Sequence, residues 1–365
     1  MNTPTIIIDN GSGLIKAGDS SEELPKIVFP CVVGHSKETN KLENIGDFAR
    51  FSKDLNLQQP IQRGIINDWN DIEDIWDFAF EELQVESSDQ VVMLTQAALT
   101  PPIHKEKMAQ IMFEGFGVKG LDVMMQSLLE LYFSGRTTGV VVDCGYGMCQ
   151  VVPIYNGYMM EHATLRLTCA GEEINEYLRK LLIERGIIFS TESEKIEVER
   201  IKERLGYVAF DYKEESTLAS LSSELDKKYE LPDGQIISIG SERFKCSEVL
   251  FEPNIIGKET SGIHEITYNS IMQCDCDLRK DMYNNIVLCG GSSMFPGMKQ
   301  RFIKEITVLS PPTIQINVDC NRKRKYGAWI GGKMFASLSS FEERYMKKAE
   351  YDEFGASYIN SKDKK

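Results

Sequence analysis

The sequence lacks several features that would assign it to a familiar class at once. It has no apolar run long enough to cross a bilayer and no pattern typical of a secretory signal at its N-terminus. Its four histidines are isolated, and its nine cysteines include no C-x-x-C pair. The nearest two, Cys274 and Cys276, are too close for the usual zinc spacing. We therefore expect a reducing intracellular environment, no membrane insertion and no structural metal.

Basic residues are fewer than acidic residues. The 365 residues include 41 Lys and Arg against 55 Asp and Glu, which gives a net charge of −14. Proteins that bind nucleic acid normally carry a basic patch, so we expect no direct nucleic-acid partner. The length predicts two or three domains, with ample chain for large cores.

Two short stretches carry almost the same pattern. Residues 6–13 read IIIDNGSG and residues 140–147 read VVVDCGYG, so each has three β-branched residues, an aspartate and a Gly-x-Gly. A β-branched run is typical of a buried strand, and the glycines predict a tight turn. A second apolar run follows each turn, over residues 14–18 and 148–152. Each stretch is therefore predicted to form a strand–turn–strand hairpin.

Both hairpins have the composition of a phosphate-binding site. A glycine turn lets backbone N–H groups approach a phosphate and donate hydrogen bonds to it. Asp9 and Asp143, at the ends of the first strands, could hold the water shell of Mg²⁺, and Lys16 could add a positive charge. Either hairpin alone is more simply explained as an ordinary glycine turn. Because the aspartate and both glycines recur in register, the pair favours two hairpins that clamp a polyphosphate.

Further stretches add to this organisation. Residues 286–297 (IVLCGGSSMFPG) predict a strand, a glycine pair and a helix that begins near Pro296, an arrangement that also suits a nucleotide. The polar residues 35–45 predict an exposed loop. Helical spacing predicts helices over residues 70–83 and 192–205, and an apolar helix that contains Gln126. On spacing alone, Gln126 is a tolerated polar residue of that helix.

Longer motifs resemble the actin family. They are residues 8–13 (IDNGSG), 134–139 (SGRTTG), 152–155 (VPIY), 229–234 (YELPDG), 262–265 (GIHE), 324–332 (RKYGAWIGG) and 350–353 (EYDE). These motifs follow in order along nearly the whole chain. They are more specific than the glycine hairpins, which sugar kinases and heat-shock chaperone ATPases also carry. The resemblance implies the two-lobed α/β fold of this superfamily, with a mixed five-stranded sheet and helices in each lobe and the nucleotide in the interlobe cleft.

The same resemblance implies four subdomains. Subdomain 1 would comprise residues 1–30, 60–133 and 327–365, and subdomain 2 would comprise residues 31–59 with a shortened exposed loop at 35–45. Subdomain 3 would comprise residues 134–169 and 259–326, and subdomain 4 residues 170–258.

By resemblance, the cleft would hold ATP or ADP with Mg²⁺, or with Ca²⁺ as the alternative ion. Asp9 and Asp143 would hold the metal through water, and Gln126 would help to place the attacking water at the hinge between the lobes. The residues implied to contact the nucleotide are Gly11, Ser12, Gly13, Leu14, Lys16, Gly145, Gly147, Lys202, Glu203, Gly290, Gly291, Met294 and Lys325.

Two cleft positions depart from the actin pattern. Tyr146 stands where actin has an acidic residue of the metal shell, and Gln150 stands where actin has the histidine associated with the lytic water. A glutamine can orient water but cannot act as a base in the way that histidine can. Since hydrolysis depends on positioning and electrostatics, we expect nucleotide binding with weak or absent hydrolysis.

The surfaces through which actin subunits join end to end differ as well. The loop at 35–45 is shorter than actin's and lacks its apolar tip. Phe133 replaces a small residue in the cleft that receives this loop, and Lys258 and Arg344 replace apolar residues. A head-to-tail contact of this kind builds an open filament, so these changes predict impaired self-polymerisation.

Three functions remain open from the sequence. The favoured one is a divergent actin-related protein that serves as a subunit of a larger complex or caps a filament, with actin, other actin-related proteins or actin-binding proteins as partners. The second is a divergent conventional actin that forms filaments and hydrolyses ATP. The third, a kinase or chaperone ATPase of the same superfamily, fits the motifs least well. The expected location is the cytoplasm and cytoskeleton, with the nucleus as the alternative.

Overall fold

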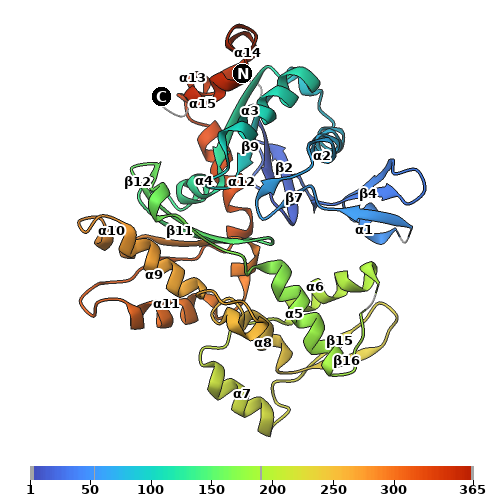
Figure 1. The fold of residues 1–365 in the computed structure, drawn as a ribbon, viewed down its shortest axis with the longest axis vertical. Helices are drawn as coiled ribbons and strands as arrows, with labels where there is room; N and C mark the ends of the chain where they lie inside the picture. The colour runs from blue at the N-terminus through green and yellow to red at the C-terminus, as the bar shows by residue number, and fades with distance from the viewer. Residues whose placement is uncertain (1–3, 53, 190, 363–365) are drawn as a thin grey trace.

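The computed structural model describes residues 4–52, 54–189 and 191–362. Two α/β lobes lie one above the other, and the first and last described residues both belong to the upper lobe as drawn (Figure 1). The chain leaves the upper lobe through helix α4 (Gln126–Phe133) and returns to it through helix α12 (Gly327–Ala336). These two helices pack against each other, so the two crossings between the lobes lie side by side.

The upper lobe is built on a mixed sheet. Its strands, in spatial order, are β19 (Met346–Lys347), β10 (Gly120–Met125), β9 (Val91–Gln96), β1 (Ile6–Asn10), β2 (Leu14–Asp19) and β3 (Ile27–Pro30). Strand β1 pairs with β2 antiparallel and with β9 parallel. The sheet edge at the carboxyl ends of β1 and β9 therefore faces the lower lobe, together with the first glycine turn.

The lower lobe repeats this arrangement. Its strands are β13 (Tyr158–Met159), β12 (Cys149–Tyr155), β11 (Gly139–Cys144), β17 (Ile286–Cys289) and β18 (Val318–Asp319), with β14 (Leu165–Leu167) also paired to β12. Strand β11 pairs with β12 antiparallel and with β17 parallel, as β1 does with β2 and β9. The two sequence hairpins thus occupy equivalent places in two sheets, which confirms the predicted two-lobed mixed α/β fold.

The predicted number of strands was wrong, because each sheet has six strands among the described residues instead of five. The short strands β19, β13, β14 and β18 have only two or three residues each. Such brief pairings leave no alternating pattern in the sequence.

Helices cover the sheets on both lobes (Figure 1). In the upper lobe they are α2 (Trp69–Leu83), α3 (Pro102–Gln110), α13 (Phe341–Arg344), α14 (Lys348–Phe354) and α15 (Ile359–Lys362), besides α4 and α12. In the lower lobe they are α5 (Gly171–Glu184), α6 (Glu192–Leu205), α7 (Tyr212–Leu221), α8 (Glu242–Glu248), α9 (Ile263–Gln273), α10 (Arg279–Asn284) and α11 (Met298–Leu309). A two-stranded hairpin, β15 (Lys227–Glu230) and β16 (Ile236–Ile239), flanks α5 and α6, and its turn lies at the predicted Pro-Asp-Gly.

Helix α2 illustrates how the sequence sets an element. The Asp68 side chain accepts hydrogen bonds from the backbone N–H groups of Asn70 and Asp71 at 3.0 and 3.1 Å, so the helix begins one residue before the predicted start. Such a cap typically contributes about 1 kcal/mol. The apolar face predicted from spacing, which includes Ile72 and Trp76, is fully buried.

The predicted exposed loop at residues 35–45 is mostly a hairpin. Strands β4 (Val33–Ser36) and β5 (Leu42–Ile45) pair with each other, and β4 also pairs with β6 (Leu55–Gln58). Only the tip at residues 37–41 is a turn, and its exposed residues are polar. The loop prediction failed because β4 and β5 have few apolar residues and are held by their pairing. Helix α1 (Asp47–Phe51) completes this small layer at the side of the upper lobe (Figure 1).

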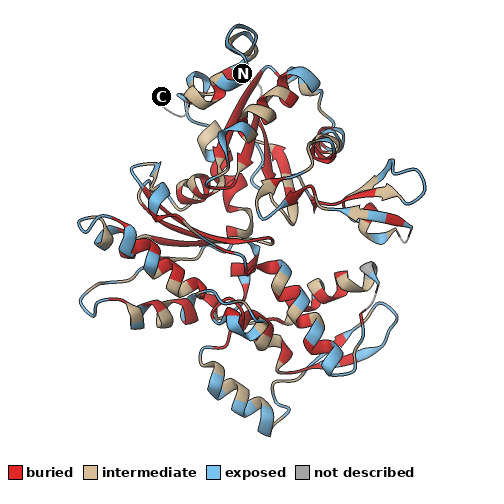
Figure 2. Ribbon diagram, viewed as in Figure 1, coloured by how far each residue is buried: buried red, intermediate tan, exposed pale blue. Residues whose placement is uncertain are grey.

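The buried residues concentrate in the two sheets and the helix faces against them (Figure 2). Separate apolar clusters fill each lobe, and two smaller ones lie near α4 and α12. Within the part of the chain that the structure describes, no helix has the length and apolar character needed to cross a membrane. The division into four subdomains stays a prediction, and its limits at residues 1 and 365 lie outside the described residues.

Candidate functional site

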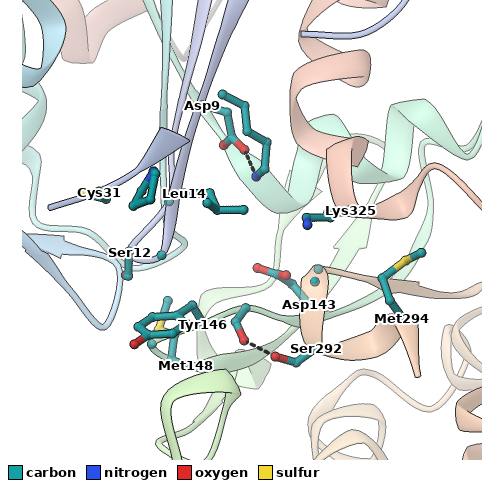
Figure 3. Close-up of a pocket in the computed structure, with 18 of the residues that line it drawn as sticks. Asp9, Ser12, Leu14, Cys31, Asp143, Tyr146, Met148, Ser292, Met294 and Lys325 are labelled. Atoms are coloured by element: carbon teal, nitrogen blue, oxygen red, sulfur yellow. Dashed lines mark hydrogen bonds and ion pairs between the residues drawn. The ribbon is translucent and has the colours of Figure 1, made fainter. Parts of the chain in front are cut away.

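A cavity of about 380 Å³ opens between the two lobes. All sixteen residues that the sequence assigned to nucleotide, metal or water line this one cavity. They are Asp9, Gly11, Ser12, Gly13, Leu14, Lys16, Gln126, Asp143, Gly145, Gly147, Lys202, Glu203, Gly290, Gly291, Met294 and Lys325. Figure 3 shows several of them, with Asp9 from the upper lobe and Asp143 from the lower lobe, beside two further lining residues of the lower lobe, Tyr146 and Ser292.

Asp9, at the end of β1, is the best-connected carboxylate of the cavity. It is 1 % exposed and accepts hydrogen bonds from Lys16 Nζ at 2.6 Å, Thr95 Oγ1 at 2.7 Å and Gln126 Nε2 at 2.8 Å. Burial by itself would raise the pKa of Asp9, but Lys16 and these hydrogen bonds outweigh it and the pKa is lowered. Asp9 is therefore a fixed negative charge at neutral pH.

Gln126, the first residue of α4, is held by the same group of residues. Its amide nitrogen also lies 3.1 Å from the Asn10 carbonyl oxygen and 3.2 Å from Thr95 Oγ1. The sequence placed Gln126 inside a helix, and the structure puts it at the point where β10 turns into α4. With its amide nitrogen engaged, Gln126 can interact with water only through its amide oxygen.

Asp143, the counterpart of Asp9 in the lower lobe, has a different environment. Burial raises its pKa to about 6, against the lowering effects of the Gln150 hydrogen bond and the Lys16 charge. Gln150 Nε2 donates to Asp143 Oδ2 at 3.1 Å. The two residues face each other across the β11–β12 ladder, which fixes this contact.

The two glycine hairpins touch each other. A Cβ on Gly13 would lie 2.6 Å from Tyr146 Cβ, and a Cβ on Gly147 would lie 3.1 Å from Ser12 Oγ. Ser12 Oγ also accepts a hydrogen bond from Gly64 N at 2.9 Å. The absence of side chains at both turns thus lets the two hairpins meet, as the clamp hypothesis requires.

The third glycine segment closes the lower side of the cavity. Gly290 has φ +81°, a left-handed conformation that favours glycine, and a Cβ there would lie 2.2 Å from the Cys144 carbonyl oxygen. Ser292 Oγ donates to the Gly145 carbonyl oxygen at 2.7 Å (Figure 3). This contact ties the 3-10 turn Gly291–Met294 to the second hairpin.

The other end of the cavity carries cationic side chains. Burial lowers the pKa of Lys202, whose Nζ lies 3.5 Å from the Gly171 carbonyl oxygen. Lys325 Nζ lies 3.7 Å from Glu203 Oε1 at the rim. Met294, 37 % exposed, adds an apolar side chain to this wall. A flat, partly apolar group with polar edges could be accommodated here.

One ion pair spans the cleft mouth. Arg50 of α1 in the upper lobe lies 2.8 Å from Glu199 of α6 in the lower lobe. Both residues line the cavity, as does Tyr146 beside them. Burial, followed by the charges of Glu199 and Glu172, raises the pKa of Tyr146 to about 12, so its hydroxyl stays neutral at physiological pH.

The end of the cavity at the two glycine turns, which the sequence assigned to phosphate and which we call the phosphate end, has residues that suit a divalent cation held through water. Among residues 4–52, 54–189 and 191–362, no three His, Cys, Asp or Glu side chains stand close enough to hold a metal directly. Mg²⁺ usually keeps several waters and takes one or two carboxylates together with phosphate oxygens. Asp9 and Asp143, one from each hairpin, supply two such carboxylates.

Together, the repeated hairpin sheets, the cavity between the lobes and the packed helices α4 and α12 define a two-lobed α/β protein with its main cavity between the lobes. Comparison with protein-family models then gives the particular family. The actin family model matches residues 1–364, so the chain belongs to the actin family.

Sequence reasoning missed some residues of the cavity. Thr95 could have been found, because it lies near the carboxyl end of the buried strand β9, which runs parallel to β1, and the carboxyl ends of parallel strands share an edge. Arg50, Glu199 and Glu130 had no such signal. Each was an ordinary charged residue of a helix until the lobes were placed together.

Proposed function

We propose that this chain is a divergent actin-related protein that binds ATP or ADP with Mg²⁺, or with Ca²⁺ as the alternative ion, in the interlobe cavity. The observation that carries the proposal is the meeting of two glycine hairpins around Asp9, Lys16 and Asp143. Backbone N–H groups of the two turns would bind the phosphates, and Lys16 would add its charge. The bound cation would neutralise phosphate charge and would be oriented by the two aspartates.

Slow hydrolysis is supported by the state of the residues around the phosphate end. Tyr146 stays neutral and packs against Gly13, so it supplies no charge to a metal shell. Gln150 is 0 % exposed and donates to Asp143, and a glutamine side chain does not take up a proton at neutral pH. Gln126 remains to orient a water, and no histidine lines the cavity beside it among the described residues. We propose that the nucleotide serves mainly to hold the lobes together.

Weak self-assembly is supported by two of the altered surfaces. The tip of the β4–β5 hairpin is polar at residues 37–41, which gives an apolar receiving cleft little to bind. Lys258, expected on an assembly loop, instead lies 2.6 Å from Glu173 and donates to the Thr168 carbonyl oxygen. The loop is thereby tied to its own lower lobe. We propose that the protein acts as a subunit of a cytoskeletal or larger assembly, with actin, actin-related or actin-binding proteins as partners.

One observation favours the alternative, a divergent conventional actin that forms filaments. Arg344 was expected to place a charge in a partner-binding groove, but its Nε lies 3.3 Å from Asp122 Oδ2 and its guanidinium lies over the Phe335 ring at 5.1 Å. The charge of Arg344 is compensated within the protein. This substitution should therefore impair partner binding at the groove less than the sequence predicted.

Two measurements on the purified chain test the proposal. The first is the identity of the bound nucleotide and its turnover: we expect bound ATP or ADP in the presence of Mg²⁺ and very slow release of phosphate. The reversal Tyr146→Asp with Gln150→His, which restores the residues of the actin pattern, should increase turnover. The second is sedimentation in Mg²⁺ and salt. Robust filaments from the chain alone would overturn the proposal in favour of a conventional actin, and absence of bound nucleotide would overturn it altogether.

A further inference from the structure

Glu130 is a buried carboxylate that the proposed function does not yet use. It is 4 % exposed, lines the interlobe cavity and belongs to α4. Its carboxyl group has a hydrogen bond with the Cys289 side chain, whereas its Oε2 atom is buried and has no hydrogen-bond partner. A buried carboxylate oxygen without a hydrogen-bond partner destabilises a protein more than an unpaired neutral oxygen does. Such an atom therefore calls for an explanation, and a bound ion is one.

Glu130 lies on the face of helix α4 that is turned toward Asp9 and the phosphate end of the cavity. It follows Gln126 by four residues, and residues at this spacing lie on the same helix face. Gln126 is hydrogen-bonded to Asp9, so this face of α4 looks toward the first hairpin. Glu130 interacts electrostatically with Asp143, Asp9 and Lys16, the charged groups of the phosphate end.

Charge balance at this end of the cavity is incomplete. Three carboxylates of the cavity, those of Asp9, Asp143 and Glu130, interact electrostatically with the Lys16 ammonium. When all three are charged, they exceed the Lys16 charge by two, which is the charge of one divalent cation. Phosphate groups would deepen this deficit, so a nucleotide can enter favourably only together with a cation.

We infer that Glu130 is a third carboxylate of the cation site and binds the cation that accompanies the nucleotide, through its water shell. Glu130 would supply the negative charge that is missing from the second hairpin, where Tyr146 replaces an acidic residue. It would do so from a different element, helix α4. The inference rests on the proposed nucleotide function. It predicts that Glu130→Gln lowers the affinity for Mg²⁺ and Ca²⁺ and leaves the thermal stability of the protein nearly unchanged.

The test compares cation affinity in ADP-loaded wild type and Glu130→Gln, measured by titration of Mg²⁺ and of Ca²⁺ against a fluorescent chelator. Loss of an outer partner of a metal site typically lowers affinity by 10- to 100-fold, and we expect roughly a tenfold loss. Glu172→Gln is the matched control, because Glu172 lies in the neighbouring cavity beside Tyr146 and not in this one. It should leave the cation affinity within about twofold, as distant charges are screened.

Glutamine is close to glutamate in shape and adds no unpaired charge to the buried position, so the Glu130→Gln variant should fold. Glu130→Asp is the second variant and should recover part of the affinity if a carboxylate is what the cation needs. Equal cation affinity in wild type and Glu130→Gln would overturn the inference, as would a loss of thermal stability without a change in cation affinity. If wild type fails to hold ADP with Mg²⁺, the proposed function itself is wrong.

Discussion

The contact between the two glycine hairpins can be tested by adding a single methyl group. In Gly13→Ala, the new Cβ would lie 2.6 Å from Tyr146 Cβ and 2.7 Å from Tyr146 Cγ. Carbon atoms in contact normally lie about 3.5–4.0 Å apart, so the hairpins would have to separate by roughly 1 Å. Overpacking of this kind typically destabilises by about 1–3 kcal/mol. If that energy is lost from the conformation that we propose to bind nucleotide, ADP affinity should fall by about 5- to 150-fold.

The assay is a double-mutant cycle on ADP affinity with saturating Mg²⁺. Tyr146→Gly removes both clashing carbons, so Gly13→Ala made in that variant should have little further effect. We expect a coupling of at least about 1 kcal/mol between the two positions, within the range found for residues in contact. A matched control is Gly291→Ala, measured by denaturant unfolding, because a Cβ there meets no heavy atom within 4 Å.

Two results would refute this reasoning. If Gly13→Ala has the same effect with and without Tyr146, the hairpins do not meet and the cavity is not closed as described. If Gly13→Ala and Gly291→Ala lower the stability of the fold equally, the effect belongs to glycine replacement in general and not to the contact.

Three further predictions concern the cleft mouth, a buried ion pair and a buried histidine. Arg50→Ala or Glu199→Gln should speed the release of a fluorescent nucleotide by up to about fivefold, since a partly exposed ion pair contributes about 1 kcal/mol or less; unchanged release would mean that the pair does not hold the cleft closed. Arg301 binds the buried Glu248 through two nitrogens, at 2.7 and 3.1 Å, so Arg301→Met should lower the free energy of unfolding by about 3–5 kcal/mol in a denaturant titration; a loss below about 1 kcal/mol would contradict a buried pair. Burial lowers the pKa of His264, so the stability that comes from its neutral form is present above the unfolded pKa of about 6.5 and is lost as the pH falls below it. His264→Phe should therefore lose less thermal stability than wild type between about pH 6.5 and 5, and equal losses would count against this cause.

Local sequence determined much of the framework. β-Branched runs ending in Asp and Gly-x-Gly specified both hairpins, because such strands and turns depend on side chains a few residues apart. The helix over residues 192–205 has the predicted bounds, and α2 begins one residue from its predicted start. The sixteen residues assigned to the cleft lie in one cavity, an assignment that came from family resemblance as much as from motif chemistry.

Tertiary structure decided the contacts between segments far apart in the chain. The sequence identified Tyr146 and Gln150 as departures, but only the structure shows that Tyr146 packs on Gly13 and that Gln150 binds Asp143. The sequence predicted that Arg344 places a charge in a partner-binding groove. The structure instead pairs Arg344 with Asp122, which lies more than 200 residues earlier.

Glu130 shows most clearly what the sequence alone does not reveal and the tertiary structure does. In the sequence it is one charged residue in an apolar helix, with no motif around it. Its burial and its place beside Asp9 and Asp143 arise only when α4 is packed between the lobes. The charge of a site is a property of three-dimensional proximity, because Coulomb interactions depend on distance in space and on burial, and neither is written in the local order of residues.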